Sequence, residues 1–364
     1  MKKKTNVSYK MTDKKQKNNK ATTTKKKQDP KNVKGVKGGV KGVNGVKDVK
    51  KPHVNKNCFV YMCDRNARMS DGKTEAQVMK ELEEIFMNST SKYEMIGDPS
   101  QNGFALIVNG YREKRIVIKI PRTTNGTVDS LKYEYVMGCH IRKTLCKIIP
   151  NFMKVCGYIH KNDNEYLILE RILPGTTLRD LTKENPQPAF TTLTSDVFLS
   201  VVLQVLCAVQ VAQTRLGFVH YDLHFGNIVI KKDPKAPKVI VYEYIDRFRD
   251  LHTVRVPVHD GIIAVIIDYG RTHTTRSVSF FKKNPECFKP YKFLLDKKRL
   301  PNIVDIRLFD PVYDAKRFCR ILECYLDKPH EFSYEYYDGM EEPHDVIVAL
   351  INNYTNNKNK LSID

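Results

Sequence analysis

The sequence lacks paired cysteines and an apolar leader, and it has few long hydrophobic runs. None of its nine cysteines belongs to a Cys-x-x-Cys pair, and no cysteine and histidine group has zinc-site spacing. We therefore expect reduced thiols, mostly buried as small apolar residues, in a cytosolic compartment. The first 57 residues are strongly polar, which predicts no secretory signal there.

One apolar run stands out, VFLSVVLQVLCAVQVAQ at 197–213, and it contains no charged residue. It is slightly short for a bilayer span, and it includes Gln204, Gln210 and Gln213. The run therefore predicts a buried core helix and no transmembrane segment.

Arginine is absent from residues 1–57, which hold 19 lysines and three acidic residues, a charge of +16. The whole chain carries +21, so the other 307 residues carry only about +5 (21 − 16). The repeat VKGVKGGVKGVNGVKDVK at 33–50 cannot build a core, which predicts a disordered arm over 1–57. The arm is either a contact for polyanions such as nucleic acid, acidic protein or membrane surface, or a solvated tail without a partner.

The rest of the chain predicts an α+β fold with two lobes. Residues 58–91 contain an apolar stripe at helical spacing over 73–87 and are predicted as a helical extension. Residues 92–170 predict a small lobe with an antiparallel meander, a helix at 129–145 and two more strands.

Residues 171–364 predict a second, mainly helical lobe. Its longest helix is expected to start after an N-cap at Ser195 or Asp196. An alternating pattern at about 233–262 predicts an inserted hairpin, and two further helices are predicted near 314–326 and 343–356.

Two polar motifs follow apolar runs in this second segment. His220, Asp222 and Asn227 lie in VHYDLHFGNIV, and Asp268 begins the Asp-Tyr-Gly of AVIIDYG. In-line phosphoryl transfer needs a carboxylate at the acceptor hydroxyl, and carboxylate or amide oxygens for metal ions. The two motifs have the spacing of H-R-D-x-x-x-x-N and D-F-G.

Segments earlier in the chain contain further motifs that phosphoryl transfer needs, and they occur in the same order as in the template. The strand IVIKI has the form of V-A-I-K, with Lys119 as the phosphate-binding amine. Glu134 lies in the following helix, where a partner for that amine is expected. The connector LILERILPG offers backbone groups of Glu170 and Ile172 to an adenine.

The stretch IGDPSQNGF is the candidate phosphate loop. It contains Gly97 and Gly103 but not G-x-G-x-x-G, because Ser100 takes the place of the middle glycine and one extra residue separates the outer two. The turn-forming SQNG still favours a cradle of backbone N–H groups. Which amides contact ATP stays open.

In this order, the motifs resemble those of the protein-kinase-like superfamily. The resemblance implies phosphoryl transfer from ATP with Mg²⁺, or with Mn²⁺ in its place. It implies that Lys119 binds the α/β-phosphates and that Glu134 holds Lys119. It also implies Asp222 as catalytic base, and Asn227 and Asp268 as metal ligands.

The match covers about 92–327 and departs from the usual pattern at two loop positions. Tyr221 replaces the Arg that in many protein kinases pairs with a phosphorylated activation loop, which implies activity independent of such a phosphate. His224 replaces a Lys that would help neutralise the transferred group. A His does so when protonated or by donating one hydrogen bond.

The inserted hairpin, a missing Ala-Pro-Glu and a short C-terminal end resemble the divergent Ser/Thr protein kinases of large DNA viruses, including the poxvirus late virion kinase. The stretch FDPVYDAKRFCRILECYL, with Asp314 near its start, resembles the helix that anchors the catalytic loop. This likeness implies a truncated second lobe. It also implies a location in host cytoplasm or the virion for a viral protein, and in the cytoplasm otherwise.

Three functions stay open. A Ser/Thr protein kinase, acting on a protein substrate, is favoured by the truncated end and by the basic Arg271, Arg276, Lys282 and Lys283. A small-molecule phosphotransferase of the aminoglycoside or choline kinase type is favoured by His224, since HYDLHFGN resembles that catalytic loop. A pseudokinase scaffold is disfavoured by the intact motifs. The physiological substrate, the preference for Ser/Thr over Tyr and the oligomeric state are not indicated.

Overall fold

The computed structural model describes residues 58–64, 66, 72–87, 93–100, 103–108, 115–121, 123–124, 127–128, 131–161, 164–181, 194–288, 305–325 and 340–357. All of them lie within one compact unit, Asn55–Asp364. The basic arm predicted at 1–57 lies outside these residues.

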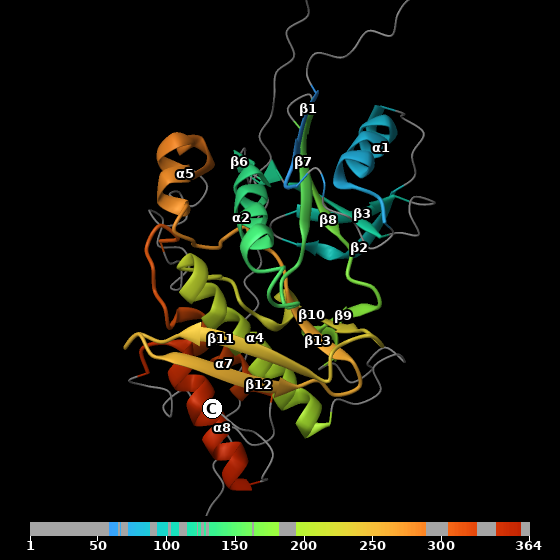
Figure 1. Ribbon diagram of the computed structural model, residues 1–364. Helices are drawn as coiled ribbons and strands as arrows, with labels where there is room; N and C mark the ends of the chain where they lie inside the picture. Colours follow the sequence, from blue (N-terminus) through green and yellow to red (C-terminus); the bar gives the residue numbers. More distant parts are fainter. Residues whose placement is uncertain are drawn as a thin grey trace, which may run out of the picture. The chain divides into compact units, whose positions relative to one another are not determined.

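A six-stranded antiparallel sheet forms the first lobe, in the order β1-β7-β8-β4-β3-β2 (Figure 1). The predicted meander is confirmed, since β2, β3 and β4 pair in sequence order. The segment predicted as a helical extension also contributes the edge strand β1, which pairs with β7. The strands are β1 Cys58–Met62, β2 Tyr93–Ser100, β3 Gly103–Val108, β4 Ile116–Pro121, β7 Val155–Lys161 and β8 Asn164–Glu170, with β5 Thr123–Thr124 and β6 Thr127–Val128 paired to each other.

Helices α1 (Glu75–Met87) and α2 (Leu131–Thr144) cover opposite faces of this sheet (Figure 1). Leu167 of β8 packs in the core that holds α2, whereas its neighbour Ile168 packs in the core that holds α1. Successive side chains of a strand point to opposite faces, so one sheet separates the two cores. Gly138 allows α2 to approach closely, because a Cβ there would lie 2.2 Å from Cγ2 of Val155.

The second lobe combines helices with two small sheets. One sheet has the order β13-β10-β9, and the other is the hairpin β11-β12. Its helices are α3 Leu178–Leu181, α4 Ser195–Leu216, η3 Phe225–Asn227, α5 Ser277–Lys283, η4 Pro285–Phe288, α7 Tyr313–Tyr325 and α8 Pro343–Asn357. Its strands are β9 Gly175–Thr177, β10 Ile228–Lys232, β11 Val239–Ile245, β12 Leu251–Pro257 and β13 Ile262–Ile266.

The N-cap of helix α4 lies one residue before the first of the two predicted caps. Thr194 is the N-cap, in place of Ser195 or Asp196, because its backbone is extended and its side chain accepts the N–H of Val197. Gly217 ends the helix in the left-handed conformation, at φ 58°, which glycine adopts without steric cost.

Among the described residues, α4 is long and apolar enough to cross a membrane by length and composition alone, and 89 % of its most apolar window is buried inside the fold. Its glutamines bond to other elements of the same lobe. Gln204 bonds to backbone groups of β13, Gln210 to Glu342 and Gln213 to the carbonyl of Pro311. These contacts fit the predicted core helix, because buried amides need such partners.

The predicted hairpin insert is present as β11 and β12, which pair antiparallel from Val239–Pro257 to Ile245–Leu251. Alternate side chains of β11 are buried, and both strands contact α4. Tyr242 reaches through this face, where its hydroxyl donates to Oδ1 of Asn151 at 2.9 Å. The insert is thus part of the second lobe's core.

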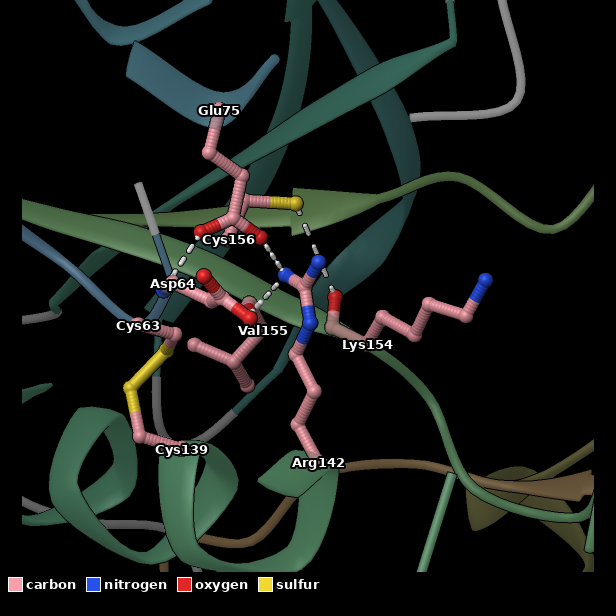
Figure 2. The surroundings of a disulfide bond; sticks show 8 residues. All are labelled: Cys63, Asp64, Glu75, Cys139, Arg142, Lys154, Val155 and Cys156. Atoms are coloured by element: carbon pink, nitrogen blue, oxygen red, sulfur yellow. Dashed lines mark hydrogen bonds and ion pairs between the residues drawn. A yellow bond between two sulfur atoms is a disulfide. The ribbon is translucent and has the colours of Figure 1, made fainter. Parts of the chain in front are cut away.

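Cys63 and Cys139 form a disulfide, so the prediction of reduced thiols is wrong for these two residues (Figure 2). The bond joins the end of β1 to α2, and the two residues are 76 positions apart, too far for local spacing to reveal. Beside it, Glu75 of α1 forms a buried ion pair with Arg142 of α2, and the N–H of Asp64 donates to the same carboxylate at 2.9 Å. Five other cysteines are not in a disulfide and are buried or half-buried: Cys146, Cys156, Cys207, Cys287 and Cys319.

Candidate active site

The loop between α4 and β10 carries the first motif, and α7 anchors its backbone. Asp314 is fully buried, and its carboxylate accepts the N–H groups of His220 and Tyr221, the latter at 2.9 Å. Tyr221 has a φ of 59° and packs against Tyr313, with its hydroxyl donating to the carbonyl of Leu308. The residue that replaces Arg is therefore a buried structural side chain.

Two arginines that sequence reasoning did not connect with Asp222 contact its carboxylate. Arg317 of α7 donates to Oδ1 at 3.0 Å and to the carbonyl of Tyr221 at 3.0 Å. Arg271, directly after Asp-Tyr-Gly, lies 3.7 Å from the same Oδ1. A signal existed for Arg317, because it follows Asp314 by one helical turn and so shares the face that holds the loop.

Asn227 and His224 also take part in the structure of this loop. The side-chain N–H of Asn227 donates to the carbonyl of Asp222 at 2.9 Å. His224 Nδ1 accepts the N–H of Gly226 at 3.0 Å, with Arg179 3.4 Å away. Burial lowers the pKa of His224, so the neutral ring has Nε2–H as its one donor. Of the two ways in which a His could assist, the structure favours the single hydrogen bond.

Lys119, Glu134 and Asp268 form a cluster of charges in which Glu134 is buried and Lys119 and Asp268 are partly exposed. Lys119 Nζ lies 2.7 Å from Glu134 Oε2 and 2.9 Å from Asp268 Oδ1. Burial disfavours the ammonium, but the two carboxylates outweigh it and raise the pKa of Lys119. Burial raises the pKa of Glu134 to about 7, against the attraction of Lys119. Asp268 is ionised at neutral pH, because Lys119 holds its pKa below the usual range although burial opposes this.

Buried hydrogen bonds hold the Asp-Tyr-Gly turn in its conformation. Asp268 has a φ of 66°, a conformation that surrounding structure must hold in place for a residue with a Cβ. Tyr269 has a hydroxyl that a Phe at this position would not have. This buried hydroxyl has a partner, because it donates to the carbonyl of Met153 at 2.9 Å. His220 Nε2 lies 2.9 Å from the carbonyl of Ile267, so the two motifs are directly joined.

The two predicted metal ligands keep oxygen atoms that fit a hard cation. Asn227 uses its N–H in the loop, and its Oδ1 accepts no hydrogen bond from the described residues. Asp268 uses Oδ1 toward Lys119 and the N–H of Gly270, at 3.3 Å, and its Oδ2 has no such partner. An amide and a carboxylate oxygen are ligands that Mg²⁺ prefers, so these residues fit the ion.

Comparison with known proteins adds sequence relatives of viral origin. No family model matches the chain. The chain is 26 % identical over 148 residues to "Probable kinase 098L" of Invertebrate iridescent virus 3, which is 40 % of this chain and 26 % of that protein. It is 28 % identical over 169 residues to "Uncharacterized protein 179R" of Invertebrate iridescent virus 6, covering 44 % of this chain and 13 % of that protein. The chain thus spans less than a third of either relative.

The kinase-named relative and the ordered cluster of Lys119, Glu134 and Asp268 agree with each other. The chain is similar to proteins of the protein-kinase-like superfamily. Two solved structures show partial likeness. The crystal structure of the PF14_0431 kinase domain is 19 % identical and covers 52 % of each chain, with a TM-score of 0.33. The structure of WaaP in complex with acyl carrier protein is 11 % identical and covers 77 % of this chain and 93 % of that one, with a TM-score of 0.37. Both are too distant to place any residue.

The candidate phosphate loop of this kinase-like chain lies in the hairpin between β2 and β3. Gly97 and Ser100 belong to β2, and Ser100 pairs with Gly103 at the start of β3. The register shifts between Ile96 and Ser100, so the strand is bulged where a backbone cradle is expected. The amides that would contact ATP remain a prediction.

In the connector, one of the two predicted adenine contacts already uses its backbone N–H. The N–H of Glu170 donates to the carbonyl of Lys154 at 3.0 Å, and the side chains of the two residues form an ion pair at 3.3 Å. Ile172 makes no backbone hydrogen bond with the described residues. The N–H of Glu170 is therefore already used, and the adenine contacts of Glu170 and Ile172 stay a prediction.

The segment after Asp-Tyr-Gly is held against α2 without any phosphate. The Tyr133 hydroxyl donates to the carbonyl of Thr272 and lies 2.9 Å from Oγ of Ser277. Its ring stacks on Phe281 of α5, with centroids 4.5 Å apart. The sequence analysis assigned no role to Tyr133.

Proposed function

We propose that this chain transfers the γ-phosphoryl group of ATP to Ser or Thr hydroxyls of proteins, with Mg²⁺ or Mn²⁺. One observation carries the proposal. Lys119 lies between Glu134 and Asp268, and the Asp268 turn is hydrogen-bonded to the loop that carries Asp222. Phosphoryl transfer depends mainly on positioning and electrostatic stabilisation, which is what a preorganised cluster of this kind provides.

Each side chain has one task in this proposal. Lys119 donates hydrogen bonds to oxygens of the α- and β-phosphates, and Glu134 keeps its amine in place. Asp222 orients the acceptor hydroxyl and takes its proton. A metal ion held by Asn227 and Asp268 supplies positive charge to the phosphate oxygens.

The arginines beside Asp222 compensate for the missing Lys. His224 is neutral and gives one hydrogen bond, whereas Arg271 and Arg317 carry permanent charge within 3.7 Å of Oδ1. A guanidinium can both orient the carboxylate and offer a second edge to a phosphoryl oxygen. We assign the neutralising role to this pair.

A protein substrate is favoured by charge on the surface of the segment after the metal-binding turn. Arg276, Lys282 and Lys283 are exposed on or next to α5, whose Phe280 and Phe281 face inward. The positive charge of these exposed side chains attracts acidic segments of other proteins. The catalytic-loop likeness at His224 favours the small-molecule alternative, so the assay must include both classes.

Activity does not require phosphorylation of this segment in our proposal. Thr272, Thr274 and Ser277 are fully buried and cannot reach another kinase without local unfolding. Tyr221 cannot pair with a phosphate, since its hydroxyl is bonded inside the fold.

The deciding experiment is transfer of radiolabelled phosphate to acidic proteins, basic proteins, aminoglycosides and choline. We expect label on protein Ser or Thr, and its loss by more than about a hundredfold in Asp222→Asn. Asp260→Asn, an exposed acid on the hairpin side, is the matched control and keeps parent activity. Label only on aminoglycoside or choline would replace this proposal with the small-molecule one. No transfer to any acceptor would contradict both.

We further infer that the protein is viral, as its relatives are, acting in host cytoplasm or packaged in the virion. The arm 1–57, with +16 of the +21 charge, is proposed to bind polyanions. Deleting it should leave peptide phosphorylation intact and shift elution from heparin to lower salt. Elution at unchanged salt would place the polyanion contact elsewhere.

A further inference from the structure

Three potential metal ligands from two distant segments meet where the hairpin insert contacts α8. Asp246 follows β11, His252 lies on β12, and His344 is in the first turn of α8. One ligand atom from each of the three lies within 4.8 Å of the other two. The side chains of Asp246 and His252 are 5 % and 22 % exposed, so the group is sheltered but within reach of solvent.

The hairpin turn fixes the carboxylate. Asp246 Oδ1 accepts the N–H groups of Phe248, at 2.9 Å, and Asp250, at 2.8 Å. Its Oδ2 faces away from these amides and lies 2.9 Å from Nε2 of His252. Oδ1 therefore stabilises the hairpin turn, and Oδ2 lies on the side of the histidines.

His344 is oriented by partners that are not ligands. The hydroxyl of Tyr244 lies 2.9 Å from Nδ1 of His344, and the backbone N–H of His344 donates to Oε1 of Gln210 at 3.1 Å. Its ring lies against that of His252, with centroids 4.2 Å apart. A metal-ligating His commonly uses its other ring nitrogen in such a bond, which leaves Nε2 of His344 for an ion.

Hydrogen bonding alone accounts for only part of this arrangement. The contact between Asp246 and His252 is satisfied without a third group, and the bonds of His344 to Tyr244 and Gln210 do not use its Nε2. Zinc is bound by His nitrogen and Asp oxygen at about 2.0–2.2 Å, which places tetrahedral ligands roughly 3.3 Å apart. The observed spacings of 2.9 Å to at most 4.8 Å reach this geometry with small side-chain shifts.

The surrounding charge also suits a cation. Glu342 and Asp345 lie near His344 and interact with it electrostatically. Arg247 is a nearby positive side chain, and it is paired with Glu341 and lies 3.9 Å from Asp345. Among these described neighbours, acidic groups outnumber basic ones.

We propose that Asp246, His252 and His344 bind one Zn²⁺ ion, which ties the hairpin insert to α8. Two imidazoles among three ligands favour zinc over Mg²⁺ or Ca²⁺, which prefer oxygen. Three protein ligands leave a fourth position for water. This site is separate from the candidate active site and does not depend on the proposed phosphoryl transfer.

The test is zinc titration of the full chain after chelator treatment, by calorimetry and by the visible absorption of Co²⁺ in its place. We expect one tight site and a tetrahedral Co²⁺ spectrum that Zn²⁺ abolishes. His344→Ala should lower zinc affinity by more than about 100-fold, because it removes a ligand. His259→Ala, on the same insert but outside the group, should bind zinc like the parent.

A second variant separates binding from folding. Tyr244→Phe keeps all three ligands and removes only the hydroxyl that orients His344, so affinity should fall by about 10- to 100-fold. Equal zinc affinity in the parent, His344→Ala and Tyr244→Phe would overturn the proposal, since the ion would then bind elsewhere. Absence of a one-equivalent site in the parent would also overturn it.

Discussion

The disulfide between Cys63 and Cys139 is the structural feature most open to direct test. It links the residue after β1 to α2 (Figure 2). Helix α2 also carries Glu134. The change is reduction, or replacement of both residues by Ala. Because the bond closes a loop of 76 positions, the chain-entropy relation gives about 4.5 kcal/mol of stabilisation. Measured losses for native disulfides are typically 2–5 kcal/mol, so we expect a value in that range.

Urea unfolding with and without reductant measures this contribution. The parent should lose about 2–5 kcal/mol in reductant, and the double Ala variant should not respond to it. Cys156→Ala is the matched control, since Cys156 is buried on the neighbouring strand and does not belong to a disulfide. It should keep the parent's response to reductant. Transfer activity well below the unfolding midpoint should persist in reductant, because the contacts of Lys119 with Glu134 and Asp268 involve neither cysteine. Equal stability with and without reductant, together with a labelled thiol at Cys63, would refute the reasoning.

Three further outcomes follow from buried polar groups. Asp314→Ala leaves two buried N–H groups without an acceptor and should cost about 2–6 kcal/mol in urea unfolding, whereas Asp310→Asn should cost under about 1 kcal/mol. Burial, and then the charge of Arg276, lowers the pKa of His140 to about 4, below its unfolded value near 6.5, so stability is full above pH 6.5 and falls toward pH 4. For this half-exposed ring the loss should be on the order of 1–2 kcal/mol, and His140→Gln should remove it while His259→Gln should not. Phosphatase treatment should leave specific activity within about twofold, since the segment after Asp-Tyr-Gly is held by packing and not by phosphate; a tenfold loss would contradict this.

Much of the candidate site could be predicted because its chemistry is encoded locally. Asp222 and Asn227 share one loop, and Lys119 and Asp268 each stand at a recognisable place relative to an apolar strand. The spacing of residues along a strand or loop limits the directions in which their side chains can point. The order of the motifs in the chain therefore predicted that Lys119 and Glu134 would be in contact. The structure places them 2.7 Å apart.

The parts that the sequence did not reveal depend on contacts between distant segments. Arg317 reaches Asp222 from another helix, and Cys139 meets Cys63 across a sheet edge. Hydrophobic periodicity indicates which face of an element is buried, but not which partner covers it. The cap at Thr194 was missed for a local reason, because adjacent polar residues all suit a cap and only the backbone angle selects one.

The central claim is that the cluster of charges at Asp268 carries phosphoryl transfer. Its most direct test is the rate of label transfer from ATP by Asp268→Asn, because a neutral amide is a weaker ligand for the metal ion and a weaker partner for Lys119. We expect the rate to fall by more than about a hundredfold, with the thermal unfolding midpoint close to that of the parent. Transfer at the parent rate by a folded Asp268→Asn protein would contradict the account.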